Sequence, residues 1–162
     1  MQADPYASAQ VRAFVEHDYA RVVATVGAAT GAPDAAEDAV QEALVTMLAD
    51  HHEPRNARAW VTTVAINHVR TQQRRRQAER RARDRLAAPE ATDSTEVTDR
   101  RVSMLSAVAE LPPKQRTTVL MHYYLDASIA DIADALDVTE GTVKTQLHRG
   151  RAALAHLLEE AS

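Results

Sequence analysis

The sequence predicts an all-α fold of two small helical domains joined by a flexible linker. Helix-breaking residues are scarce, since the 162 residues include only 4 glycines and 6 prolines. Apolar residues also return every three or four positions along most of the chain, which is the pattern of amphipathic helices. That pattern stops over residues 86–99, which are rich in Pro, Ser, Thr and acidic residues and are therefore predicted to form the linker.

The composition excludes several classes of protein. The chain has no cysteine, so it has no disulfide framework, no thiol nucleophile and no zinc site built on thiolates. No run of 18 uncharged apolar residues is present, and the N-terminus carries no apolar signal segment. We therefore expect a cytoplasmic protein with no membrane insertion.

The first domain is predicted to span residues 1–85 and to contain three helices. Its first helix is expected over 7–28, where apolar side chains recur on one face, and Gly31 and Pro33 end it. These side chains are Val11, Phe14, Val15, Tyr19, Val22, Val23 and Val26.

The second helix is predicted to run from Asp34 to about Ala49. Asp34 and Glu37 have the spacing of a capping box, in which a short acidic side chain caps the helix and a glutamate follows three residues later. The expected buried stripe consists of Ala36, Val40, Leu44 and either Met47 or Leu48. The opposite face is a polar strip with more acidic side chains than solubility alone requires, and it consists of Glu37, Asp38, Gln41 and Glu42.

The third helix is predicted to follow a loop over 51–56 that contains Pro54. It begins at about Ala57, buries Val61, Ile66 and Val69, and becomes arginine-rich before it ends beyond Arg76. Trp60 lies on the same apolar stripe as Val64, so we assign it to the core rather than to the stacking of bases.

The second domain is predicted to span residues 100–162 and to open with two helices. The first ends before Pro112 and Pro113, because a residue that precedes proline disfavours the helical conformation. Its expected buried residues are Val102, Leu105, Val108 and Ala109. The second helix is expected over 114–124 and turns Val119, Leu120 and Tyr123 inward.

The remaining segment is typical of a helix-turn-helix. Ser128 with Asp131 resembles a capping box that opens a short helix, and Thr139 is placed as the N-cap of the next one. Val143 and Leu147 lie on the buried side of that second helix. A major groove admits such a helix, whose polar face carries Lys144, Thr145, His148 and Arg149. An ordinary antiparallel helix pair with solvated charges is the alternative.

The net charge of −4 is the sum of an acidic segment and a basic segment that largely cancel. Residues 1–54 hold nine acidic and two basic side chains, whereas residues 55–85 hold ten arginines and two acidic side chains. An arginine cluster suits phosphate, because the planar guanidinium binds oxyanions through two nitrogens and keeps its charge at any physiological pH. A solvated helix face or a disordered tail would also explain such a cluster.

Four segments in this order and spacing resemble the extracytoplasmic-function (ECF) sigma factors, the minimal two-domain specificity subunits of bacterial RNA polymerase. The segments are 34–43, 58–67 with the arginine run after it, Leu111 with the two prolines that follow, and 132–151. The resemblance covers about residues 10–78 and 102–160. It implies that the first domain is sigma region 2 and the second is sigma region 4.

The resemblance also implies partners. The acidic helix would dock on the clamp helices of the largest subunit of core RNA polymerase, with Asp38, Gln41 and Glu42 in contact. An anti-sigma factor is a further expected partner, which would wedge between the domains or cover their binding faces. The linker would permit such a compact arrangement.

Promoter DNA is the other implied partner. Asn67 matches the position that lines a pocket for a flipped-out base of the −10 element, and neighbouring arginines would hold phosphates. These arginines are Arg70, Arg74, Arg75 and Arg76. The readers of the −35 element would be Lys144, Thr145, His148 and Arg149. The loop before Trp60 is a few residues shorter than is usual in the family.

Two other functions fit parts of the sequence. A stand-alone helix-turn-helix regulator would need a self-complementary dimer helix, and none is evident. A helical enzyme would need catalytic or metal-ligating spacing. The four histidines considered for a metal site do not have it, and these are His17, His51, His52 and His68. We therefore expect no catalysis, no metal and no cofactor.

Overall fold

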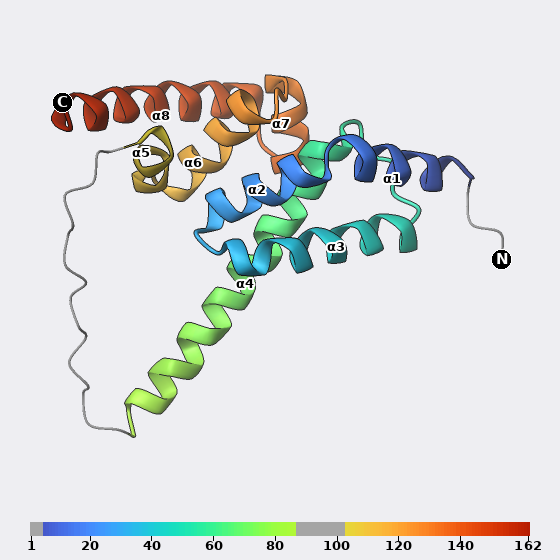
Figure 1. Cartoon of the computed structure of the whole chain (residues 1–162), viewed down its shortest axis with the longest axis horizontal. Coiled ribbons are helices and arrows are strands. Elements are labelled where there is room, and N and C mark those ends of the chain that lie inside the picture. Colours follow the sequence, from blue (N-terminus) through green and yellow to red (C-terminus); the bar gives the residue numbers. More distant parts are fainter. Residues whose placement is uncertain (1–4, 87–102) are drawn as a thin grey trace.

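The computed structural model describes residues 5–86 and 103–162, and every regular element in these ranges is helical (Figure 1). The predicted all-α fold is thus confirmed. Most of the predicted linker, together with Val102, lies outside the described residues. The elements are α1 (Pro5–His17), α2 (Tyr19–Thr30), α3 (Pro33–Ala49), α4 (Ala57–Asp84), α5 (Met104–Glu110), α6 (Pro113–Val119), the π-helical turn η1 (Leu120–Tyr124), α7 (Ile129–Leu136) and α8 (Glu140–Glu160). We call residues 5–86 the N-terminal module and residues 103–162 the C-terminal module.

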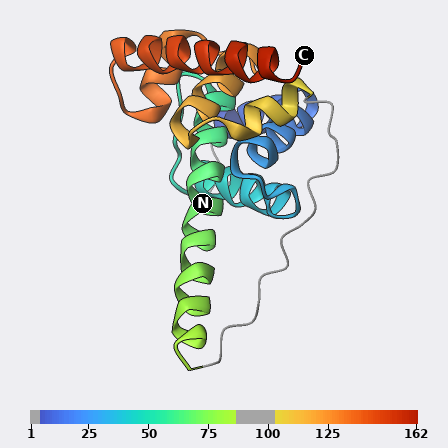
Figure 2. The same ribbon diagram turned by 90° about the vertical axis from the view of Figure 1, so that its left-hand side faces the viewer.

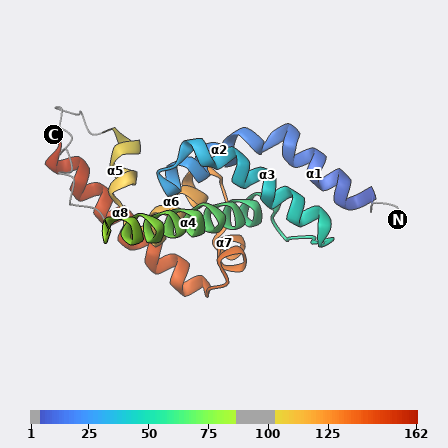
Figure 3. The ribbon, with the colours of Figure 1, turned by 90° about the horizontal axis from the view of Figure 1, so that it is seen from below.

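The 28-residue helix α4 is the axis of the molecule. Its first half packs against α2 and α3 on one side and against α7 on the other (Figure 3). Val61, Ile66 and Val69 of α4 are buried there, as the periodicity predicts. The second half extends away from the other helices and carries the exposed arginines (Figures 1 and 2).

The single helix predicted over 7–28 is wrong, because the chain forms two helices that meet at Asp18. The φ angle of Asp18, −117°, is far from the usual helical value of about −63°, although its ψ of −18° keeps the residue near the helical region. Asp is a poor residue for a helix interior, and this carboxylate lies 3.7 Å from the Nε atom of Arg58 on α4. The break is therefore coupled to a contact that local periodicity does not reveal.

The capping box predicted at Asp34 is also wrong. Helix α3 begins one residue earlier, at Pro33, after an N-cap residue that makes no side-chain hydrogen bond. Proline suits this first position because its φ angle is already helical and its missing N–H would have no partner. Asp34 falls instead in the first turn, where its negative charge is favoured by the helix dipole.

The buried stripe of α3 agrees with the prediction, and the open choice is decided. Met47 is 1% exposed and Leu48 is 41% exposed, so Met47 belongs to the core. The other core positions are Ala36, Val40 and Leu44.

The helix-turn-helix forms as its caps predict. The side chain of Ser128 accepts a hydrogen bond from the N–H of Asp131 at 3.0 Å, and that of Thr139 accepts one from the N–H of Thr142 at 3.1 Å. Asp137 ends α7 in the left-handed conformation, with φ 53°. These local bonds define both helix starts and the turn between them.

The helix predicted over 114–124 changes register at Leu120. The N–H of Leu125 bonds to the carbonyl of Leu120 at 3.2 Å, which is the five-residue spacing of a π-helix. The wider turn places Tyr123 at the surface, 51% exposed, so its predicted inward position is wrong. In α5 the predicted burial of Leu105 and Ala109 is also wrong, because Leu105 is 68% exposed and Ala109 is exposed, whereas Ala107 and Val108 are buried.

Helix α8 crosses α6 at very close range at Gly150. A Cβ atom built on Gly150 would lie 2.7 Å from the Cγ2 atom of Val119. Only a residue without a side chain fits such an approach.

Replacing Gly150 by Ala is therefore expected to lower the free energy of unfolding by about 1–3 kcal/mol, the usual cost of overpacking. In an open helix the same change gains roughly 0.5–1 kcal/mol. Gly141→Ala is the matched control, because its new methyl group would meet only the Thr139 hydroxyl at 3.8 Å. Urea unfolding followed by circular dichroism measures both. A Gly150→Ala variant as stable as the Gly141→Ala variant would contradict the close approach.

The two modules pack against each other through polar contacts. The Asp131 carboxylate accepts a hydrogen bond from Asn56 at 3.0 Å and pairs with Arg55 at 3.1 Å. Arg21 of α2 donates to the backbone carbonyl of Tyr124 and to Asp126. These contacts join α2 and the residues just before α4 to the end of η1, the residues after it and α7.

The contact at Asp131 predicts a dependence on pH. The hydrogen bond from Asn56 is the largest cause that holds the pKa of Asp131 below its usual range; the Ser128 bond and the charges of Arg55 and Arg58 add to it, and burial opposes them. A carboxyl whose pKa is lowered in the packed state stabilises that state above its ordinary pKa of about 3.9. This stabilisation is lost as the pH falls through the lowered value.

We therefore expect the modules to separate more readily below about pH 4. Small-angle X-ray scattering measures the separation as a rise in the radius of gyration. In Asp131→Asn the part of the pH dependence that this carboxyl contributes should vanish. An unchanged pH profile in that variant would show that the contact does not hold the modules together.

Candidate nucleic-acid interface

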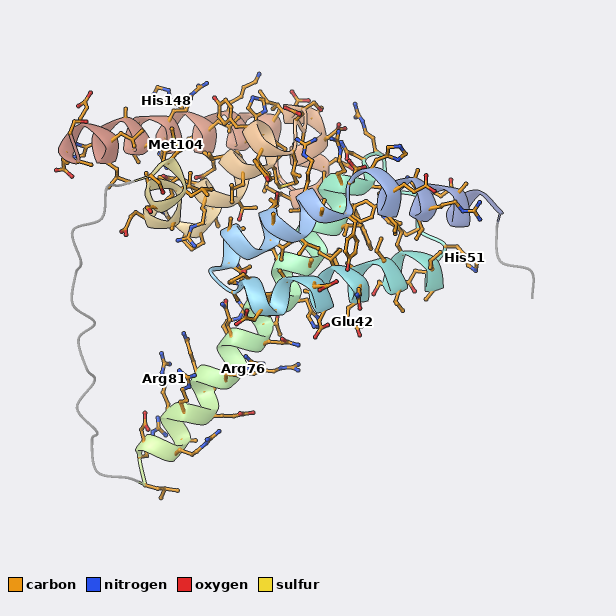
Figure 4. The ribbon with its side chains drawn as sticks, in the orientation of Figure 1. Glu42, His51, Arg76, Arg81, Met104 and His148 are labelled. Carbon is orange, nitrogen blue, oxygen red and sulfur yellow. The ribbon has the colours of Figure 1, made fainter. Side chains whose placement is uncertain are left out.

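The acidic side chains of α3 form a solvent-facing strip. Asp38, Gln41 and Glu42 are exposed, whereas their neighbours Ala39 and Ala43 are buried against α4 and α2. Figure 4 shows Glu42 on the outer side of α3. The prediction that these three residues face away from the core is therefore met by the fold.

Tyr19 forms hydrogen bonds to two residues of this strip. The sequence pattern did not predict these bonds, because it placed Tyr19 only on the apolar face of the first helix. Its hydroxyl donates to Glu37 at 3.1 Å and accepts a hydrogen bond from Gln41 at 3.2 Å. A tyrosine among valines is the available signal, because its ring suits the apolar face and its hydroxyl needs a polar partner.

The predicted −10 contacts lie along α4, and most of them are free to meet a ligand. Asn67 is exposed near the middle of the helix. Arg74, Arg75 and Arg76 are exposed on the half that extends from the body, where Figure 4 shows Arg76 and Arg81. Four of the five predicted residues are thus available at the surface.

Arg70 is placed differently. Its Nη2 atom donates to the Thr117 hydroxyl at 3.0 Å and to the Pro113 carbonyl at 3.3 Å, so α6 holds it between the modules. Burial, followed by the positive charges of Arg116 and Arg74, lowers the pKa of this guanidinium. In this arrangement Arg70 binds the C-terminal module rather than an outside partner.

The acidic strip and the arginine run meet at one cavity of about 260 Å³. Asp38 lines it from α3 and Arg76 lines it from α4, with His68 and Gln72 between them. Opposite charges therefore lie side by side at the surface of the N-terminal module. The acidic side chains are on α3 and the arginines are on α4.

The predicted −35 contacts share one face of α8. Lys144, Thr145, His148 and Arg149 are all exposed, and the opposite side of the helix is buried at Val143, Leu147 and Gly150. Within the residues that the structure describes, neither Lys144 nor Arg149 forms an ion pair. Figure 4 shows His148 on the outer side of α8, far from the extended half of α4.

The sequence matches two families, one after the other. Residues 14–79 match Sigma-70 region 2, and residues 101–154 match Sigma-70, region 4. The chain is 36% identical over 108 residues to the RNA polymerase sigma-E factor of Streptomyces antibioticus, which covers 67% of this chain and 58% of the relative. It is 37% identical over 112 residues to the ECF RNA polymerase sigma factor SigL of Mycobacterium tuberculosis, covering 65% of this chain and 62% of SigL. The chain belongs to the ECF sigma factor family.

Two solved structures have the same fold. The sigma factor RpoE of Bartonella quintana, solved in complex with the anti-sigma factor NepR, superimposes with a TM-score of 0.67 at 26% identity, over 87% of this chain and 91% of that one. CnrH, solved in complex with the cytosolic domain of CnrY, gives a TM-score of 0.64 at 22% identity. This chain spans about three-fifths of the length of the two curated relatives named above.

Trp60 of this family member is partly buried and packs against the core, in keeping with its predicted role there. The ring of His52 lies 4.9 Å from it. The loop that carries His52 turns at His51, whose φ is 49°, and buries Pro54. Trp60 thus contacts both the core and the loop before α4.

In residues 5–86 and 103–162 no three acidic or histidine side chains gather as metal ligands would. None of the helices in those ranges is both long and apolar enough to cross a membrane.

Proposed function

We propose that this chain directs transcription initiation as a sigma factor, by binding core RNA polymerase and recognising the −10 and −35 elements of promoters. The observation that carries the proposal is the order of three exposed surfaces on one chain. The acidic strip of α3, the arginine run of α4 and the polar face of α8 follow one another within segments that match regions 2 and 4.

Core polymerase is the proposed partner of the acidic strip. Asp38, Gln41 and Glu42 would contact the clamp helices of the largest subunit, and their exposure on a rigid helix supports this role. Charge complementarity of this kind speeds association and selects the partner.

Promoter DNA is the proposed partner of the basic surfaces. Asn67 would take a flipped base of the −10 element, while Arg74, Arg75 and Arg76 hold nearby phosphates. Lys144, Thr145, His148 and Arg149 would read the −35 element in the major groove. Arg70 would join the −10 contacts once it leaves Thr117.

Each proposed domain would recognise one promoter element. Residues 1–85 would bind the −10 element, residues 100–162 would bind the −35 element, and residues 86–99 would connect them. The extended half of α4 and the outer face of α8 lie at opposite ends of the packed molecule (Figures 1 and 2). Promoter binding would therefore separate the modules and release Arg70. Such a protein would act in the cytoplasm without catalysing a reaction.

An anti-sigma factor is the proposed regulator. The Bartonella quintana relative was solved with such a partner, and in this chain the packed modules already hold Arg70 away from DNA. A regulator that stabilises this arrangement would keep the chain inactive. Full activity of the free chain in cells without any inducing signal would contradict this part of the proposal.

In-vitro transcription with purified core polymerase on a random promoter library tests the function. We expect run-off transcripts that depend on this chain and start downstream of two enriched elements. Binding to a palindromic site without any transcript would overturn the proposal in favour of a stand-alone regulator.

A further inference from the structure

A cavity of about 410 Å³ lies between the two modules, beside the residues that hold Arg70. Arg70 and Arg74 line it from α4, and Lys114 and Arg116 line it from α6. The end of α2 borders it at Ala29 and Thr30. The cavity therefore exists only while the modules are packed together.

Its charge is unbalanced. The lining holds four cationic side chains and no carboxylate. Within the part of the chain that the structure describes, none of the four forms an ion pair, whereas two other arginines between the modules do. Those two are Arg21, paired with Asp126, and Arg55, paired with Asp131.

Among the described residues, Arg70 and Arg116 form hydrogen bonds only to neutral oxygen atoms, so no carboxylate neutralises their charges there. Arg116 gives its terminal nitrogens to the carbonyls of Ala29, Ala109 and Leu111, yet its buried Nε atom has no hydrogen-bond partner among the described residues. The charges of Arg116 and Arg74 add to burial in lowering the pKa of Arg70, which is a sign of mutual repulsion. An anion in the cavity would relieve that repulsion.

We propose that this cavity binds a small anion with two linked phosphate groups, such as the diphosphate of a nucleotide-like metabolite. The volume falls in the range of small-molecule sites, roughly 300–1,000 Å³. Linked phosphate groups carry several negative charges, which oppose the charges of the four cations. Arginine forks are also suited to phosphate oxygens.

The position of the cavity gives the ligand a regulatory effect, which rests on the proposed function. A ligand held by α4 and α6 stabilises the packed arrangement, because it binds that state and not the separated modules. It also binds Arg74 and keeps Arg70 hydrogen-bonded to Thr117 and Pro113, so it competes with promoter DNA for both arginines. The diphosphate is therefore an inhibitor of DNA binding.

Isothermal titration calorimetry with inorganic diphosphate and the full chain, without polymerase, tests the site itself. The variants are Arg74→Gln and Lys114→Gln, both at exposed positions that leave the core intact. Each is expected to weaken binding by about 10-fold or more, the usual loss for a charged hydrogen bond. The matched controls Arg81→Gln and Lys144→Gln remove the same charge from exposed positions outside the cavity, and they should bind as the unchanged chain does.

Three results would overturn the proposal: no binding of diphosphate at millimolar concentration, equal weakening in the control variants, or dependence on Lys114 for duplex DNA but not for diphosphate. The third result would assign the cavity to the DNA backbone. Because calorimetry uses no polymerase, failure here is distinct from failure of the transcription assay.

A second measurement tests the regulatory effect. The chain has no cysteine, so Glu53→Cys with Asp134→Cys provides two exposed labelling sites, one on each module and each within three residues of the Arg55–Asp131 contact. Energy transfer between the labels should rise when diphosphate is added, and Lys114→Gln should abolish the rise. Unchanged transfer in the presence of bound diphosphate would overturn the proposed stabilisation of the packed state.

Discussion

Replacing both Asp38 and Glu42 by Lys is expected to lower the affinity for core RNA polymerase by about 100-fold or more. Both side chains are exposed on the same face of α3, and the change turns an attractive contact into a repulsive one. Like charges opposed across an interface cost several kcal/mol, and about 2.8 kcal/mol corresponds to 100-fold in affinity. The fold should survive, because the buried side of α3 is untouched.

Fluorescence anisotropy of the labelled chain with purified core polymerase measures this loss. Glu159→Lys with Glu160→Lys is the control, since it makes the same change in net charge at exposed positions near the end of α8. The control should bind nearly as the unchanged chain does. If both double variants lost affinity alike, the strip on α3 would have no special role and only the net charge would matter.

Replacing both Lys144 and Arg149 by Ala is expected to abolish protection of the upstream promoter element. Both side chains are exposed on the polar face of α8 and are free of ion pairs within the described residues. A good contact with a base is worth about 1–3 kcal/mol, so the loss of two predicts a drop of at least about 30-fold in promoter affinity. Polymerase binding should be unchanged.

Footprinting of the reconstituted holoenzyme on a selected promoter tests this result. Arg151→Ala is the control on the same helix, because its guanidinium donates to the Tyr123 hydroxyl at 3.0 Å instead of facing outward. Its footprint should remain complete. Loss of polymerase binding in the Lys144 and Arg149 double variant would refute the separation of the two roles.

Local patterns in the sequence were sufficient to predict most of the helices and the first residues of α7 and α8. Ser128 and Thr139 cap α7 and α8 as predicted, because a capping bond spans only three residues. Asp34 had the spacing of a cap but is not one, because Pro33 beside it begins the helix. Where two local signals compete, the sequence alone does not decide between them.

Features that depend on contacts between helices escaped prediction. The break at Asp18 accompanies its pairing with Arg58, which lies on another helix. The register change at Leu120 brings Tyr123 to the surface against the apolar periodicity. Such changes follow from packing rather than from the intrinsic preference of a segment.

Some features of the candidate site were predictable from local sequence and others were not. The exposure of Asp38 and Lys144 follows from their position opposite an apolar stripe, so it was predictable. The location of Arg70 was not, because its partner Thr117 lies 47 residues further along the chain. The cavity beside it was missed for the same reason, since it needs side chains from both modules.

The arginines that join the modules affect which sequence changes the interface can tolerate during evolution. Arg21, Arg70 and Arg116 each donate to a main-chain carbonyl across the boundary, at Tyr124, Pro113 and Ala29. Every amino acid offers that acceptor, so mutation of the acceptor residue need not be compensated by mutation of the arginine. Correlated substitutions, which usually betray contacting positions, would therefore be faint between these modules. A retained arginine opposite a freely varying position would be the evolutionary trace of this interface.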